Sequence, residues 1–191
     1  MSGKTILEEW NSIQIPSAPE IINVGVKAEN TAFLVLDIQI TNCNSERRPR
    51  CVDNLPKIKS FLDKARASNF LIIYSLTSNA IKDEIRTEVK PLDDESIVKS
   101  GVDKFLNTTL EAILRSNKIE NVIIVGTSAE GAVLNTATAA AQRKYKVIIP
   151  IDGLSSTESF AELYTIWHLA NSPGTRRNTV LTKFDLIEIV K

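Results

Sequence analysis

The residues of this sequence best suited to chemistry follow short apolar runs. Asp37 closes the run TAFLVLD, and Lys99 ends the shorter stretch SIVK. A small and polar loop, Thr127–Gly131, comes after the β-branched run NVIIVG. Loops that follow the strands of α/β proteins hold their chemistry, so each position is a candidate. By itself, an aspartate after a strand is most often a turn former or a helix cap, and a lysine is most often solvated.

The elements that would position these residues alternate between strand and helix. Asn121 to Asp152 reads as one strand–loop–helix–strand unit, and the alanine-rich helix in it has few breakers. This alternation predicts an α/β fold, a three-layer α/β/α sandwich with a mostly parallel sheet of about six strands. The predicted strands are 31–37, 70–76, 97–98, 121–125, 146–151 and 179–182, and the predicted helices are 52–68, 105–115, 132–144 and 158–170.

Composition limits the classes of protein that fit. With 191 residues we expect one domain, 31–191, preceded by an N-terminal arm, 1–30. The formal net charge is zero, so we expect no general attraction to nucleic acid or to an anionic membrane. No apolar stretch is long enough to span a bilayer, and the N-terminus lacks an apolar signal core. Two cysteines make no disulfide framework, although they are close enough in sequence to pair, and we predict a cytoplasmic protein.

Cofactor and metal motifs are missing from the sequence. It contains neither a glycine-rich dinucleotide fingerprint nor a phosphate-binding loop, so we expect no cofactor. Its single histidine, His168, falls in a predicted helix and reads as structural. A zinc site built on histidine pairs is therefore not expected.

Two segments keep two interpretations each. The arm contains Pro16 and Pro19 among several apolar residues, and it is either a strap on its own domain or a bridge between subunits. The loop with Arg47, Arg48 and Arg50 reads first as solvated. Its alternative is a lid or a carboxylate clamp, because the guanidinium fork matches a carboxylate.

The central unit resembles the signature of the isochorismatase-like, or cysteine hydrolase, superfamily. Gly126 stands at the strand end, and Thr136, Ala137 and Ala140 fall at the family's helix positions. Ala132 occupies the position of the family's nucleophilic cysteine. The resemblance also implies a cis peptide in the loop, for which Ser128–Ala129 is the candidate bond.

Two further motifs follow the family's order. Asp37 and Gln39 after the first apolar run resemble its opening motif, in which the aspartate is the acid/base residue. Lys99, followed by Phe105, Thr108 and Leu110, resembles its lysine motif. The resemblance thus implies Lys99 as the pocket lysine, with Lys104 as the competing choice that we place on a helix.

The resemblance implies a site at Asp37, Lys99 and Ala132, with no metal. The substrate-binding positions that it implies are Gln39, Phe105, Ser128, Ala129 and Gly131. Amide hydrolysis through a thiolate fails at Ala132, which has no sulfur. Isochorismatases carry a small residue there and use the aspartate as a general acid toward a vinyl ether. The Trp-Arg that follows their lysine is replaced here by Ser100 and Gly101.

These features leave several functional hypotheses. The first is a cysteine-independent hydrolase of a small polar metabolite, and the second is an inactive relative that binds a small molecule or serves in assembly. The third is a hydrolase with another nucleophile, such as Cys43, Ser128 or a bound water. Glu130 either adds an acceptor to the pocket or is simply exposed. Family members commonly assemble, so the resemblance also implies a homo-oligomer.

Overall fold

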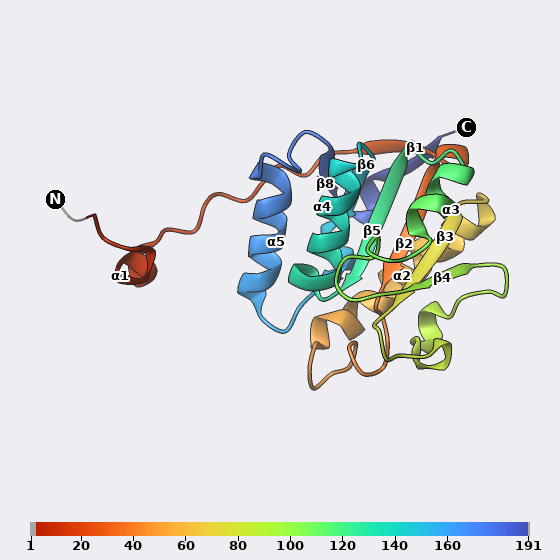
Figure 1. Cartoon of the computed structure of the whole chain (residues 1–191), viewed down its shortest axis with the longest axis horizontal. Coiled ribbons are helices and arrows are strands. Elements are labelled where there is room, and N and C mark those ends of the chain that lie inside the picture. The colour runs from red at the N-terminus through yellow and green to blue at the C-terminus, as the bar shows by residue number, and fades with distance from the viewer. Residues whose placement is uncertain (1–2, 191) are drawn as a thin grey trace.

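The computed structural model describes residues 3–190, and these form a three-layer domain with a projecting arm (Figure 1). The helices are α1 (Ile6–Glu9), α2 (Pro49–Ala67), α3 (Leu110–Ser116), α4 (Leu134–Gln142) and α5 (Ser159–Asn171). The strands are β1 (Val24–Lys27), β2 (Thr31–Leu36), β3 (Leu71–Leu76), β4 (Ser96–Lys99), β5 (Asn121–Thr127), β6 (Lys146–Pro150), β7 (Leu154–Ser155), β8 (Thr179–Thr182) and β9 (Ile187–Val190).

The central sheet is parallel throughout. Its strands run in the order β4-β3-β2-β5-β6-β8, and β7 pairs with the end of β5. A small second sheet joins β1 to β9, also in parallel. The carboxyl ends of all strands of the main sheet therefore lie along one edge, where the predicted site residues follow the strands. The predicted α/β sandwich is confirmed.

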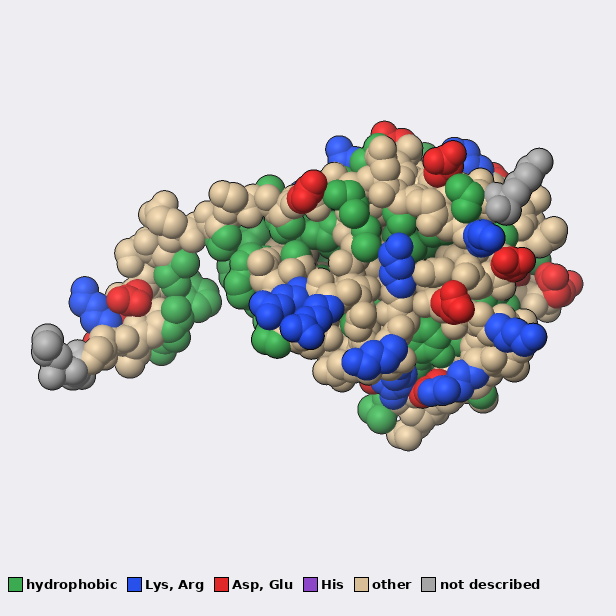
Figure 2. Space-filling model, turned by 90° about the horizontal axis from the view of Figure 1, so that it is seen from above, with side chains coloured by type: hydrophobic (Ala, Val, Ile, Leu, Met, Phe, Trp, Pro, Cys, Tyr) green, Lys and Arg blue, Asp and Glu red, His purple; other side chains and the backbone are tan. Residues whose placement is uncertain are grey.

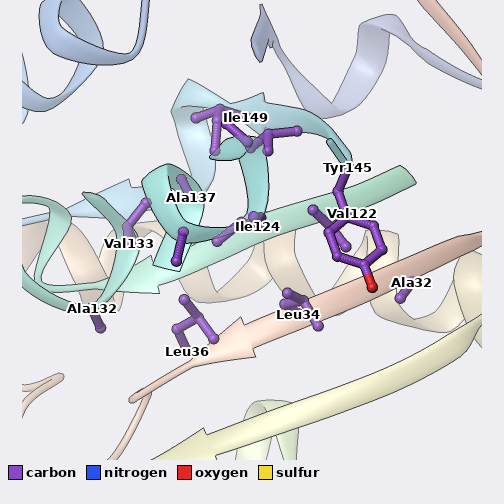
Figure 3. Close-up of a cluster of buried hydrophobic side chains, with 14 of the residues drawn as sticks. Ala32, Leu34, Leu36, Val122, Ile124, Ala132, Val133, Ala137, Tyr145 and Ile149 are labelled. Carbon is purple, nitrogen blue, oxygen red and sulfur yellow. The ribbon is translucent and has the colours of Figure 1, made fainter. Parts of the chain in front are cut away.

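Alternating side chains of the central strands build a core on each face of the sheet. Ala32, Leu34 and Leu36 of β2 pack with α3, α4 and α5, and Figure 3 shows part of this cluster. Phe33 and Val35 point the other way and pack with α2, β1 and β9. Both faces of β2 are buried, which explains its continuous apolar sequence.

Gly126 is needed at the end of β5. Its φ is +132°, a backbone conformation that residues with a side chain rarely adopt. A Cβ added there would lie 2.0 Å from the carbonyl oxygen of Leu36, the residue that pairs with it on β2. The glycine therefore lets the ends of β2 and β5 approach each other closely, which brings the residues that follow the two strands together.

Several predicted boundaries move. The helix after Lys99 begins only at Leu110, so Phe105 lies on a turn before it. The predicted helix 132–144 opens with a π-helical turn, η5 (Ala129–Val133), before α4 begins at Leu134. Short-range sequence patterns do not distinguish such turns from the first turn of an α-helix, since both use the same residues.

The predicted arm, residues 1–30, is divided by the structure. Val24 and Val26 are buried and belong to β1, so this end of the segment is part of the domain. The portion with α1 and the turn Trp10–Ser12 projects from the body and contains no buried residue (Figures 1 and 2). The interpretation as a strap on its own domain therefore does not hold for this portion. No helix within residues 3–190 has the length and apolar character needed to cross a bilayer.

Candidate active site

Asp37 is held in place at the carboxyl end of β2. Its φ is +51°, an uncommon conformation for a residue other than glycine. Its backbone N–H lies 3.3 Å from the carbonyl oxygen of Ser75 and 3.2 Å from the Ser75 hydroxyl. That hydroxyl in turn donates to Asp37 Oδ1 at 2.7 Å. One carboxylate oxygen is thus fixed by β3, which leaves the orientation of the other well defined.

Lys104 supplies the partner of the second carboxylate oxygen. Its Nζ lies 2.8 Å from Asp37 Oδ2, and the side chains are 0% and 6% exposed, respectively. The same ammonium group donates to the carbonyl oxygens of Gly101 at 2.6 Å, Ser100 at 3.2 Å and Leu76 at 3.5 Å. A buried ion pair is stable only when further hydrogen bonds compensate the lost water, and these carbonyls supply them.

The structure corrects the prediction that Lys99 is the pocket lysine. Lys99 is the last residue of β4 and is exposed, whereas its neighbour Val98 is buried. Strand side chains alternate, so burying Val98 turns Lys99 outward. The chain then turns back and brings Lys104 to Asp37. Lys104 is not on a helix, as the sequence suggested, but on the turn before α3.

Thr136 fixes the turn that carries Lys104. The Lys104 N–H donates to the Thr136 hydroxyl at 3.1 Å, and that hydroxyl donates to the carbonyl of Val102 at 3.3 Å. Thr108 also donates to the Lys104 carbonyl. The threonine singled out on α4 thus positions the lysine from across the sheet edge.

The loop after β5 carries two buried alanines, and one of them, Ala132, is the residue predicted from the sequence to stand at the family's cysteine position. Ala129 and Ala132 are 0% and 3% exposed, and both belong to the same apolar cluster as Leu36, the residue before Asp37 (Figure 3). Ser128 and Gly131 are partly exposed. The cis peptide is Thr127–Ser128, one residue earlier than the candidate bond.

Two of the predicted substrate contacts are engaged elsewhere. The buried Gln39 amide lies 3.4 Å from the Thr77 hydroxyl and accepts a hydrogen bond from Asn42 at 3.1 Å.

The Phe105 ring stacks on Tyr145 with centroids 6.2 Å apart, and the guanidinium of Arg143 lies 4.6 Å from the centroid of the Phe105 ring. Tyr145 lies just before β6, at the amino ends of the parallel strands, whereas Asp37 lies at their carboxyl ends. The structure therefore does not bring the Phe105 ring to the site.

The burial of Asp37 sets its acidity. Desolvation raises the pKa of this carboxyl above its ordinary 3.8, and this effect outweighs the opposing effects of Lys104, Ser75 and Arg48. Burial disfavours the ionised form of an acid because water no longer solvates its charge. A carboxyl group of this kind retains a proton at higher pH than an exposed aspartate, which a general acid requires.

A second group of charges is built around Ser156. The Ser156 hydroxyl donates to Glu130 at 2.5 Å, and its N–H donates to Glu162 at 2.8 Å. Glu162 also pairs with Arg50 at 2.7 Å. Among residues 3–190, no three histidine, cysteine or acidic side chains are grouped as metal ligands would be. Asp37 is engaged by a lysine and a serine, which is not a metal-binding set.

The cysteines form a disulfide between Cys43 and Cys51. No described cysteine is a free thiol. Cys43 is therefore excluded as the alternative nucleophile. Disulfides are typical of oxidising compartments, and the predicted cytoplasmic location stays a prediction.

Sequence reasoning missed Ser75 and the burial of Arg48. Ser75 stands near the end of the apolar run FLIIYSL, where a lone hydroxyl at a strand end was the available signal. Arg48 is 6% exposed, unlike the exposed Arg47 and Arg50 beside it. No local pattern in the sequence distinguishes it from them.

A parallel α/β/α sandwich with an aspartate–lysine pair at its carboxyl edge fits the cysteine hydrolase superfamily that the sequence resembles. The chain belongs to the isochorismatase family, since the isochorismatase domain matches residues 31–182. This match contains Asp37, Lys104 and Ala132.

Individual relatives agree with this assignment. A secreted isochorismatase effector, Isc1, from Verticillium dahliae is 30% identical over 114 residues, which span 54% of this chain and 60% of the effector. An N-carbamoylsarcosine amidase from Arthrobacter is 27% identical over 97 residues, which span 50% of this chain and 37% of the amidase. The chain thus spans less than two thirds of the length of either curated relative.

Solved structures share the fold. A cysteine hydrolase from Pseudomonas syringae superposes with a TM-score of 0.74 at 18% identity, covering 88% of this chain and 95% of the other. An isochorismatase-like hydrolase from Alkaliphilus metalliredigens gives 0.73 at 22% identity, covering 82% and 93%. The nicotinamidase from Staphylococcus aureus gives 0.71 at 20% identity, covering 81% and 99%.

Proposed function

We propose that this protein is a hydrolase of a small polar metabolite that works without a cysteine nucleophile. Asp37 is its general acid, and Lys104 supplies electrostatic support. The observation that carries the proposal is the buried ion pair between Lys104 Nζ and Asp37 Oδ2, 2.8 Å apart, next to a loop that offers Ala132 and no thiol. Removing two charges from water costs free energy, and buried titratable pairs of this kind cluster at functional sites.

The reaction that fits these groups is cleavage of a vinyl ether. Asp37 gives its proton to the terminal vinyl carbon, and the neighbouring ether carbon becomes an oxocarbenium ion. Water adds to that carbon and releases a proton, which restores the Asp37 carboxyl group. The resulting hemiketal collapses to a ketone and an alcohol, so the net change is addition of one water and rupture of one C–O bond. Lys104 stabilises the Asp37 carboxylate while its proton is on the substrate.

The partly exposed residues Ser128 and Gly131 are proposed to line the entrance to this centre. Gln39 contributes by holding the loop after β2 through its bonds to Thr77 and Asn42. Phe105 has no part in this proposal, because its ring stacks on Tyr145.

The test is turnover by the purified protein. The panel consists of isochorismate, simpler vinyl ethers, primary amides and carbamoyl compounds. We expect cleavage of a vinyl ether, with kcat reduced at least about a hundredfold in Asp37→Asn, because general acid catalysis typically contributes that much. The matched lysine variants are Lys104→Met, expected to be similarly impaired, and Lys99→Met, expected to retain activity. Equal activity in Asp37→Asn and wild type would refute the mechanism.

A second candidate is a small-molecule-binding protein that has lost catalysis. The observation in its favour is the near-complete burial of Asp37 and Lys104 together with the missing thiol at Ala132. This candidate predicts no turnover of any panel member, together with saturable binding of one of them in isothermal calorimetry. Turnover that depends on Asp37 would exclude it.

We also propose that the chain forms a homo-oligomer through its arm. The arm exposes Leu7 and Trp10, which are 78% and 58% exposed, and Figure 2 shows hydrophobic side chains both on the arm and where it leaves the body. An apolar groove lies there, between the root of the arm and α5, and Ile15, Ile21, Leu163, Ile166 and Trp167 contribute to it. The arm of a second copy is its proposed occupant, because one exchange would cover apolar surface on both chains.

A further inference from the structure

Arg48 is a buried cation without an anionic partner. It lies at the N-terminal boundary of α2 and is 6% exposed. Arg47 and Arg50 on the same loop are exposed, and Arg50 pairs with Glu162. Among residues 3–190, by contrast, Arg48 forms no ion pair within 4.0 Å. A guanidinium group stays ionised in proteins, so burying it without a counter-charge is unfavourable.

The hydrogen bonds of the Arg48 side chain are also incomplete. Its Nη1 donates to the Asn42 carbonyl at 3.1 Å. Its Nε is buried and has no hydrogen-bond acceptor in the described part of the chain. Buried donors are nearly always satisfied in native proteins, so a donor of this kind indicates a missing acceptor. Nε belongs to the fork of donors with which arginine binds a carboxylate in bidentate fashion.

Hydrogen bonds connect this guanidinium to the loop that follows Asp37. Arg48 donates to the Asn42 carbonyl at 3.1 Å, and the Asn42 amide donates to the Gln39 side chain at 3.1 Å. The Gln39 N–H in turn donates to the Asp37 carbonyl at 2.9 Å. Arg48 and Asp37 thus belong to one hydrogen-bonded loop. The charges of Asp37 and Glu130 also favour the ionised form of Arg48, against burial and the Arg47 charge, which lower its pKa.

The backbone around Arg48 is fixed before any ligand arrives. The disulfide Cys43–Cys51 closes the loop that contains it. Within that loop, the Arg48 N–H donates to the Asn44 carbonyl at 2.9 Å, and the Arg48 carbonyl accepts from Cys51 N–H at 2.9 Å. Preorganisation lowers the entropy lost when a ligand binds, which distinguishes Arg48 from a mobile surface arginine.

We propose that Arg48 binds a carboxylate of the substrate and makes this site selective for small organic acids over neutral analogues. This inference rests on the proposed function in one respect, that the ligand occupies the Asp37 centre. It adds that the metabolite is an anion, and that its carboxylate is held by the arginine fork while its reacting group faces Asp37.

The experiment measures binding separately from catalysis. Acetate, pyruvate and benzoate are titrated into Asp37→Asn protein in isothermal calorimetry, alongside acetamide, pyruvamide, benzamide and inorganic phosphate. We expect at least one carboxylate to bind at least about tenfold more tightly than its amide, since a buried donor left unpaired penalises the neutral ligand. Tighter binding of phosphate than of every carboxylate, or equal binding of acids and amides, would overturn the proposal.

Matched variants assign the preference to one side chain. Arg48→Gln is expected to abolish the carboxylate preference, and Arg48→Lys, which keeps the charge but not the fork, to restore only part of it. Arg47→Gln removes the same charge from an exposed neighbour and is expected to change affinity less than about twofold. Circular dichroism checks that each variant is folded. A carboxylate preference that survives Arg48→Gln in folded protein would refute the assignment.

The two proposals can fail independently. In enzyme that keeps Asp37, the single substitution Arg48→Gln is expected to raise KM for an acidic substrate, with a smaller change in kcat. Turnover with equal KM in Arg48→Gln and Arg47→Gln would leave the hydrolase proposal standing and refute this one. Carboxylate binding that depends on Arg48, without turnover of any substrate, would support the role of Arg48 and refute the hydrolase proposal.

Discussion

The site at the carboxyl edge of the sheet and the N-terminal arm distribute charge and apolar surface in opposite ways. At the edge, Asp37, Lys104 and Arg48 are all nearly inaccessible to water. In the arm, Leu7 and Trp10 are largely exposed. Each arrangement is unfavourable in an isolated chain, because water solvates charges well and apolar groups poorly. We therefore expect a small polar ligand to bind at the edge and an apolar surface to cover the arm.

The largest expected effect comes from breaking the buried ion pair. Lys104→Met leaves the Asp37 carboxyl without its cation, and we expect the free energy of unfolding to fall by about 3 kcal/mol, as for other buried pairs that lose one partner. Lys99→Met is the matched control, because that lysine is exposed at the end of β4. Its effect is expected to stay within about 0.5 kcal/mol. Urea unfolding at pH 7 measures both.

A double variant sharpens this prediction. Adding Asp37→Asn to Lys104→Met removes the orphaned charge, so the double variant is expected to recover part of the loss. Stabilities of the single variants that simply add would contradict the ion pair. Equal losses in Lys99→Met and Lys104→Met would contradict the placement of Lys104.

A somewhat smaller effect is expected from the disulfide next to the site. Replacing Cys43 and Cys51 together by alanine opens the loop that carries Arg48, and the loop-closure estimate for so short a loop is about 2–3 kcal/mol. The carboxylate preference should weaken as well, since the guanidinium is no longer held. Alkylation with and without reductant, followed by mass spectrometry, reports whether the bond is present. Labelling of both thiols in unreduced, denatured protein would contradict it.

The pH dependence of stability reports on the burial of Asp37. In the unfolded chain this carboxyl titrates near 3.8, whereas its pKa in the fold is raised by desolvation. Between the two values the folded state holds a proton that the unfolded state has lost, so stability falls as pH rises through this window. The slope reaches at most about 1.4 kcal/mol per pH unit.

The control is Asp37→Asn, which lacks this titration. The difference in unfolding free energy between wild type and Asp37→Asn should decline as the pH is raised from 3.8 toward the folded pKa, and then level off. Using the difference cancels contributions from other acids, such as Glu162, whose pKa is also raised by burial. A difference that rises with pH across this window would show that Lys104 and Ser75 outweigh desolvation.

Sequence was informative where a pattern is repeated and ambiguous where the chain folds back on itself. The apolar runs that become β2 and β5 predicted the sheet, because only a strand buried on both faces is apolar throughout. Lys99 is the last residue of β4 and Lys104 follows five residues later, so choosing between them required the path of the turn. That path depends on Thr136, which lies 32 residues further along the chain. The burial of Arg48 and the position of the Ser75 hydroxyl beside Asp37 likewise depend on tertiary packing.

The smallest expected effect on stability comes from the arm, where assembly is expected to change instead. Leu7→Ser with Trp10→Ser alters side chains that touch no core, so unfolding of the individual domain should change by less than about 0.5 kcal/mol. The apparent mass in light scattering should fall to that of one chain, because the arm no longer supplies apolar surface to its partner. Lys4→Ser with Glu9→Ser alters exposed polar positions of the same arm and should leave the mass unchanged. An oligomer that persists in the Leu7 and Trp10 variant would show that the arm does not hold the copies together.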